Sequence, residues 1–211
     1  MEIGERDHPS PKWGGEPFNR PTSAAIMPSN GDIYVSDGYG NARVHCFTGD
    51  GDYKFSWGSS GIDEGQFMRP HNIAIDADDR VYVVDREAHR VQVFDAKGKF
   101  LTMWNNIHRP DCMVLWDNHI YIGELNGMDG LGDAPDMGHR VGVYDLNGKL
   151  QARFGASQEG SGAGEFVAPH GIAVDSHGGL FVAEVSYTMG GRHMIPPREL
   201  RSLSKYDRVT S

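Results

Sequence analysis

The chain has 211 residues, 38% of them hydrophobic and 23% charged, and a formal net charge of −9 at pH 7. This balance is typical of a folded domain with a substantial core, and the acidic charge argues against a nucleic-acid partner, whose binding needs clustered Lys and Arg. Apolar runs such as residues 81–84 are too short to cross a bilayer, and the first residues lack the apolar core of a signal peptide. The sequence therefore leaves the compartment open.

The 28 glycines and 11 prolines favour many short strands joined by tight turns over a helical fold. Cys46 and Cys112 fall in or beside predicted strands. Two cysteines are too few for a disulfide framework in a chain of this length, so both are predicted to be small buried apolar residues.

A proline-centred motif recurs along the chain and begins each of four similar blocks. Its clearest copy spans residues 67–76, and further copies span residues 18–22, 107–111 and 166–175. A second motif follows each proline about fifteen residues later, as expected for tandem repeats of one structural unit. The second motif ends in an acidic residue in every block, and these residues are Asp37, Asp85, Glu124 and Glu184.

The predicted elements in chain order are a polar loop over residues 1–17 and then four blocks of short strands rich in Val, Ile, Tyr and Phe. The third and fourth blocks are each interrupted by a long break, after Glu124 and over residues 185–199, and the fourth lacks its outermost strand. The strands predicted from these patterns are residues 23–27, 32–36, 43–47, 53–57, 72–75, 81–84, 90–94, 100–104, 140–144, 150–154 and 200–206.

Four strands in a block of about 40 to 50 residues, with no sustained helical period, predict an all-β fold of the β-propeller class. Because four repeats are at the lower limit for propellers, the chain is expected to be the C-terminal part of a larger one, with its blades in an open arc. The uncovered blade faces of such an arc would favour self-association. The blades of this single domain, residues 18–211, are expected at about residues 18–58, 65–105, 107–155 and 164–209.

Blade topology predicts one face that collects the candidate site residues. In an antiparallel blade, the start of the first strand and the loop between the second and third strands lie at the same edge. His71 and His170 begin first strands two blocks apart, and Tyr39 and Arg86 lie in second-to-third loops. All four side chains are therefore expected on this face.

Two imidazoles that face a central channel are good ligands for zinc. The alternative is that channel histidines are simply held by hydrogen bonds, which is the interpretation for the other eight histidines. Near a metal, Tyr39 suits a general base, and Arg86 suits a clamp on a substrate carboxylate. The alternatives are that Tyr39 is a packing residue and that Arg86 belongs to a surface ion pair.

Three segments, residues 33–43, 65–71 and 84–90, strongly resemble the peptidyl-alpha-hydroxyglycine alpha-amidating lyases, in particular the bacterial members. These lyases are six-bladed propellers of NHL repeats, and the resemblance covers about residues 17–209. It implies that Tyr39 is the catalytic tyrosine, Arg86 an active-site arginine, and His71 and His170 two of three zinc ligands. The third histidine and a further arginine of the family belong to two blades that would precede residue 17.

The resemblance implies a peptide or small-molecule carbinolamide substrate with a terminal carboxylate, and a peptide amide and glyoxylate as products. Zinc would polarise a substrate oxygen, Tyr39 would remove the hydroxyl proton, and Arg86 would orient the carboxylate or assist the tyrosine. Gly171 stands where these lyases often have a calcium-binding aspartate, so calcium is not expected. Thr22 and Asp111 occupy the equivalent positions of the first and third blocks, and only Asp111 could bind a metal. The rival hypothesis is a non-catalytic propeller that binds a protein or a small ligand.

Overall fold

The computed structural model describes residues 1–127, 137–156 and 158–208. It divides into two compact units, Met1–Ile107 and His108–Ser211, each described by itself below. The middle of the first predicted break, residues 128–136, lies outside the described residues. No helix in the described part of the chain is long and apolar enough to cross a bilayer.

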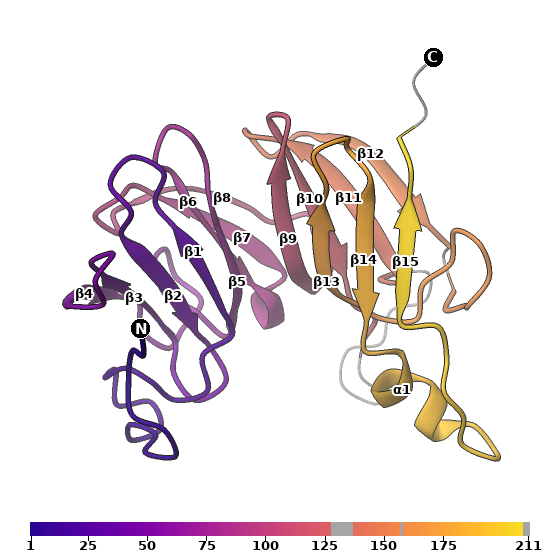
Figure 1. The fold of residues 1–211 in the computed structure, drawn as a ribbon, viewed down its shortest axis with the longest axis horizontal. Coiled ribbons are helices and arrows are strands. Elements are labelled where there is room, and N and C mark those ends of the chain that lie inside the picture. The colour runs from indigo at the N-terminus through magenta and orange to yellow at the C-terminus, as the bar shows by residue number, and fades with distance from the viewer. Residues whose placement is uncertain (128–136, 157, 209–211) are drawn as a thin grey trace. The chain divides into compact units, whose positions relative to one another are not determined.

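Unit 1 contains two antiparallel sheets in which each strand pairs with the next along the chain (Figure 1). A single turn of 3-10 helix, η1 (Arg86–Ala88), follows the second strand of the second sheet. The strands of the first sheet are β1 (Ser23–Ile26), β2 (Ile33–Asp37), β3 (Arg43–Phe47) and β4 (Tyr53–Trp57). The strands of the second are β5 (Pro70–Ile75), β6 (Val81–Asp85), β7 (Arg90–Phe94) and β8 (Phe100–Trp104).

Unit 2 contains one sheet of four strands and one of three. Two short helical turns, α1 (Ser186–Met189) and η2 (Gly191–His193), lie within the second predicted break. The strands of the first sheet are β9 (Pro110–Trp116), β10 (His119–Glu124), β11 (Arg140–Asp145) and β12 (Leu150–Gly155). The strands of the second are β13 (Pro169–Val174), β14 (Leu180–Glu184) and β15 (Leu203–Tyr206).

Each sheet has the up-and-down order of a propeller blade, so the predicted all-β, four-bladed fold is confirmed. The three strands of the last blade also agree with the sequence pattern. Its third strand begins later than predicted, at Leu203, and Leu200 packs against the apolar cluster of Leu125, Val167 and Ala168. The extent of the single domain and the open arc stay predictions.

The cores form where the apolar faces of the blades pack together within each unit. In unit 1 the fully buried Tyr34, Phe67 and Phe94 lie in one cluster, and the Tyr34 hydroxyl donates to the carbonyl oxygen of Ala96 at 2.7 Å. Both cysteines are buried and unpaired in disulfides, and burial raises the pKa of each thiol. Their prediction as small buried residues is therefore confirmed.

The acidic residue that ends the second strand of each blade holds the chain segment that leads into the first strand. Asp85 Oδ1 accepts hydrogen bonds from the backbone N–H groups of Met68 and Arg69, at 3.0 and 2.8 Å. Glu184 Oε2 does the same for Val167 and Ala168, at 2.6 and 3.0 Å. Burial raises the pKa of Asp85, although these N–H groups and the Arg90 guanidinium act in the opposite direction. The repeated carboxylate therefore fixes the backbone just before the first strands, β5 and β13.

Candidate active site

Tyr39 and His71 meet in unit 1. Tyr39 lies in the loop between β2 and β3 and is 37% exposed, whereas His71 is the second residue of β5 and is 4% exposed. The Tyr39 hydroxyl and His71 Nε2 are 2.8 Å apart, a hydrogen bond in which the hydroxyl donates when the imidazole proton is on Nδ1. The two rings meet edge to face, with centroids 5.4 Å apart. The predicted proximity of Tyr39 and His71 is thus present within unit 1.

Two arginines surround the Tyr39 ring. Arg86 Nη1 donates to the Tyr39 hydroxyl at 3.4 Å, and the guanidinium carbons of Arg69 and Arg86 lie 5.4 and 5.6 Å from the ring centroid. Glu87 Oε1 accepts from both arginines, from Arg86 Nε at 3.0 Å and from Arg69 Nη1 at 3.3 Å. Two positive charges therefore lie beside the phenol, and Glu87 pairs with both of them.

Close backbone packing places the Tyr39 loop against the start of β5. Gly38 touches the backbone carbonyl of Pro70, the residue before His71, and a Cβ at position 38 would lie 2.9 Å from the carbonyl carbon. The Thr22 hydroxyl also donates to the Pro70 carbonyl oxygen, at 2.9 Å. Because both contacts involve Pro70, the positions of Tyr39 and His71 are coupled through the backbone.

Residues 1–17, predicted to be a loop without chemistry, support the same loop from outside. The backbone N–H of Trp13 donates to the Gly40 carbonyl oxygen at 2.8 Å. The fully buried Asn41 amide donates to the Glu16 carbonyl oxygen at 2.9 Å and to Asp37 Oδ2 at 2.8 Å. The N-terminal segment thus positions the candidate catalytic tyrosine.

Replacing Asn41 with alanine should loosen this support. The substitution removes the Asn41 partner of the Glu16 carbonyl oxygen and of the Gly15 N–H, and it takes one donor from Asp37 Oδ2, which still accepts from the Asn19 N–H. This loss costs about 1–3 kcal/mol of the free energy of unfolding. Urea denaturation measures that loss, and limited proteolysis should cut residues 1–17 faster. Asn147→Ala, in an exposed hairpin of unit 2, is the matched control. Equal effects of the two substitutions would contradict this assignment.

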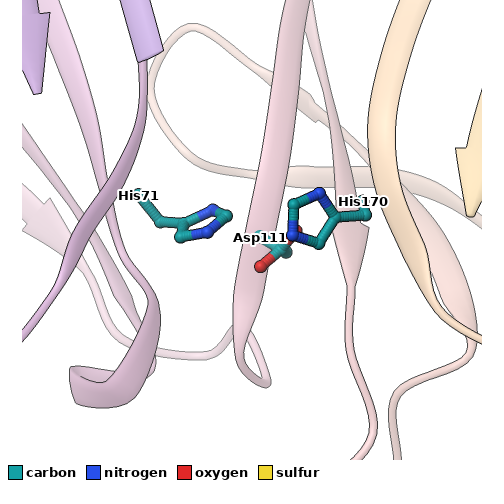
Figure 2. A group of neighbouring side chains, drawn as sticks. All are labelled: His71, Asp111 and His170. Atoms are coloured by element: carbon teal, nitrogen blue, oxygen red, sulfur yellow. The ribbon is translucent and has the colours of Figure 1, made fainter. Parts of the chain in front are cut away.

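Asp111 and His170 meet in unit 2 (Figure 2). Each is the second residue of a first strand, β9 or β13, and Asp111 Oδ2 lies 3.6 Å from His170 Nε2. The Asp111 side chain is fully buried, whereas that of His170 is 36% exposed. Figure 2 also labels His71, whose contacts within unit 1 are given above.

The donor atoms fit zinc better than calcium. In unit 1, His71 offers an imidazole nitrogen, which is a preferred zinc ligand, and in unit 2, His170 offers another beside the carboxylate of Asp111. The Tyr39 hydroxyl contacts the His71 nitrogen that a metal would need, so a metal bound at Nε2 takes the place of this hydrogen bond. Gly171 supplies no side-chain oxygen for calcium.

The structure therefore groups Tyr39, His71 and Arg86 in unit 1 and places His170 beside Asp111 in unit 2. A zinc site shared by His71 and His170 stays a prediction. Sequence reasoning missed Arg69 and Glu87, although both lie within the motifs that carry His71 and Arg86. Their charge within those motifs was the available signal. Several other histidines are hydrogen-bonded as expected, such as His45, which contacts Asp37 and Ser56, and His139, which contacts the Val167 carbonyl oxygen.

Fold and repeats together define a β-propeller that contains NHL repeats. The NHL repeat model matches residues 18–47 and 67–94, within the first two blades. A protein of unknown function from Bacteroides caccae has a similar structure, with a TM-score of 0.62 at 17% sequence identity over 89% of this chain and 63% of that chain. At this identity the similarity shows the fold alone.

Curated relatives include amidating enzymes. Peptidyl-glycine alpha-amidating monooxygenase B of Xenopus laevis is 29% identical over 89% of this chain and 22% of its own length. Peptidyl-alpha-hydroxyglycine alpha-amidating lyase 1 of Drosophila melanogaster is 29% identical over 88% of this chain and 36% of its own. Protein brain tumor, also of Drosophila melanogaster, is 28% identical over 63% of this chain and 12% of its own. The chain thus spans about a third or less of each relative, and its homology to the amidating enzymes is distant.

Proposed function

We propose that this chain carries catalytic residues of a zinc-dependent carbon–nitrogen lyase that cleaves peptidyl-alpha-hydroxyglycine compounds. The single observation that supports the proposal best is the contact of the Tyr39 hydroxyl with His71 Nε2 at 2.8 Å, beside the guanidinium of Arg86. A tyrosine, a metal-binding nitrogen and a positive charge within a few ångströms are what removal of a hydroxyl proton requires. The distant homology to amidating lyases agrees with this chemistry.

In the proposed reaction, Tyr39 removes the proton of the substrate hydroxyl. The C–O bond becomes a carbonyl, the C–N bond breaks with its electron pair going to nitrogen, and the proton that Tyr39 took is passed to that nitrogen, so the products are a primary amide and glyoxylate. The proposed zinc ligands are His71 and His170, and the ion when bound polarises a substrate oxygen. Arg86 stabilises negative charge on the Tyr39 oxygen through its 3.4 Å contact.

Arg69 suits the substrate carboxylate better than Arg86 does. The Arg86 side chain is 7% exposed and already donates to Glu87 and Tyr39, whereas the Arg69 side chain is 33% exposed at the same ring. A carboxylate can therefore approach the Arg69 guanidinium from solvent, where a charge-assisted pair forms without displacing Tyr39. In this proposal Arg69 binds the substrate and Arg86 assists the base.

The test is glyoxylate release by the full-length gene product from an N-acyl-alpha-hydroxyglycine, with zinc content measured on the same sample. We expect bound zinc, turnover with zinc present, and loss of turnover after chelation that zinc restores. Arg69→Ala should raise KM more than it lowers kcat, whereas Arg86→Ala should lower kcat.

Zinc-loaded protein that releases no glyoxylate above the uncatalysed rate would contradict the lyase proposal. The non-catalytic binding propeller would then be the better explanation, and saturable binding of the same compound without turnover would support it.

A further inference from the structure

The carboxylate of Asp111 is fully buried beside a histidine. An ionised carboxylate removed from water is unfavourable unless charged or polar groups compensate it. In unit 2, Asp111 Oδ2 faces His170 Nε2, the ring nitrogen of the histidine already proposed as a zinc ligand. The pair lies where first strands β9 and β13 begin, at the edge that also carries α1 and residues 125–127.

The separation of these two atoms favours a shared metal ion over a direct hydrogen bond. Asp111 Oδ2 and His170 Nε2 are 3.6 Å apart, which is longer than a side-chain hydrogen bond. Two ligand atoms at about 2.0–2.2 Å from a tetrahedral zinc ion lie about 3.3–3.6 Å apart. The observed separation therefore matches two adjacent ligands of one tetrahedral ion.

We infer that Asp111 is a direct ligand of the divalent metal ion that His170 binds. This inference rests on the proposed function only for the assignment of the ion as zinc. The pairing of Asp111 with His170 is a feature of unit 2 alone. A histidine and a carboxylate are a donor set typical of zinc and related transition metals. In the third block, Asp111 thus occupies the position after the motif proline where the second and fourth blocks have histidine. This block contributes a carboxylate to the metal centre in place of an imidazole.

The experiment measures binding of Co²⁺ alone, whose visible absorption is intense in tetrahedral sites, and then its displacement by zinc. Asp111→Asn keeps the shape of the side chain and removes its charge, and we expect the Kd for Co²⁺ to rise at least about tenfold with loss of the tetrahedral spectrum. Asp111→His should retain metal with a spectrum shifted by the added nitrogen. Asp117→Asn, in the exposed hairpin after β9, is the matched control and should leave the Kd unchanged.

An unchanged Kd and spectrum in Asp111→Asn would overturn the inference, and so would wild-type protein that binds no Co²⁺. Metal binding that depends on Asp111 without glyoxylate release would support the inference while contradicting the lyase proposal. If the Asp111→Asn variant keeps its full metal content and still releases glyoxylate, the lyase proposal would be supported and the inference about Asp111 would be contradicted.

Discussion

Tyr39→Phe is expected to lower lyase turnover by a factor of about 10²–10⁴, the usual contribution of a general base. The substitution removes only the hydroxyl that contacts His71 Nε2 and Arg86 Nη1. Because Tyr39 is partly exposed, the free energy of unfolding should fall by no more than about 1 kcal/mol. Steady-state glyoxylate release at saturating zinc measures the effect.

The zinc content of the Tyr39→Phe variant distinguishes a role of Tyr39 as general base from a role as metal ligand. If Tyr39 acts as the base, Tyr39→Phe binds zinc at least as well as the wild type, since a competing hydrogen bond to His71 Nε2 has been removed. Tyr53→Phe loses a comparable hydrogen bond, to Ser56 Oγ at 2.9 Å on outer strand β4, and should keep full turnover. Full turnover in Tyr39→Phe would remove Tyr39 from the mechanism.

Gly38→Ala should strongly damage the loop that carries Tyr39. The new Cβ would overlap the Pro70 carbonyl, and backbone on both sides must move to admit it. Overpacking of this kind costs about 1–3 kcal/mol of the free energy of unfolding, and occasionally more. Since Tyr39 is the next residue and His71 follows Pro70, their hydrogen bond should be lost and turnover with it.

Gly171→Ala is the matched control for this prediction. A Cβ at position 171 would lie 3.4 Å from the Ala183 Cβ, an ordinary contact, so its effect on urea denaturation should stay within about 0.5 kcal/mol. Equal unfolding midpoints for Gly38→Ala and Gly171→Ala would show that the Gly38–Pro70 packing does not hold the loop.

The strands were predictable because period-two apolar patterns and Gly or Asp turns are local signals. Four predicted strands, β3, β4, β7 and β8, match the observed bounds, and most others differ by one or two residues at an end. The proline motif also located His71 and His170 on first strands. Such local patterns do not determine how blades are arranged around an axis.

The electrostatics of the tyrosine were not predictable in the same way. Arg69 and Arg86 contact Tyr39 across 30 or more residues of chain, and Glu87 pairs with both guanidinium groups. Whether a guanidinium meets a ring or solvent depends on packing. The role of residues 1–17 was missed for a related reason. A Gly- and Pro-rich segment carries no pattern that shows which loop its backbone will support, here through Trp13 and Gly40.

The acidic residues at the ends of second strands were recognisable in the sequence, but their role was not predicted from it. Their repetition was evident in the sequence, but Asp37, Asp85, Glu124 and Glu184 are not themselves site residues. Each binds the backbone that leads into the first strand of its own blade, as Glu124 Oε2 does when it accepts from the His108 N–H at 2.9 Å. A repeated acidic residue can thus be structural while the histidine it helps to position carries the chemistry.

The reaction class is tested most directly by mass spectrometry of the products from a peptide that ends in alpha-hydroxyglycine. Cleavage of the bond between nitrogen and the hydroxylated carbon gives the peptide amide, whereas hydrolysis of the acyl bond gives the peptide acid. We predict that the zinc-loaded full-length gene product forms peptide amide and glyoxylate in equal amounts and that chelation stops both. Peptide acid as the product, or unchanged peptide at the uncatalysed rate, would contradict the proposed lyase function.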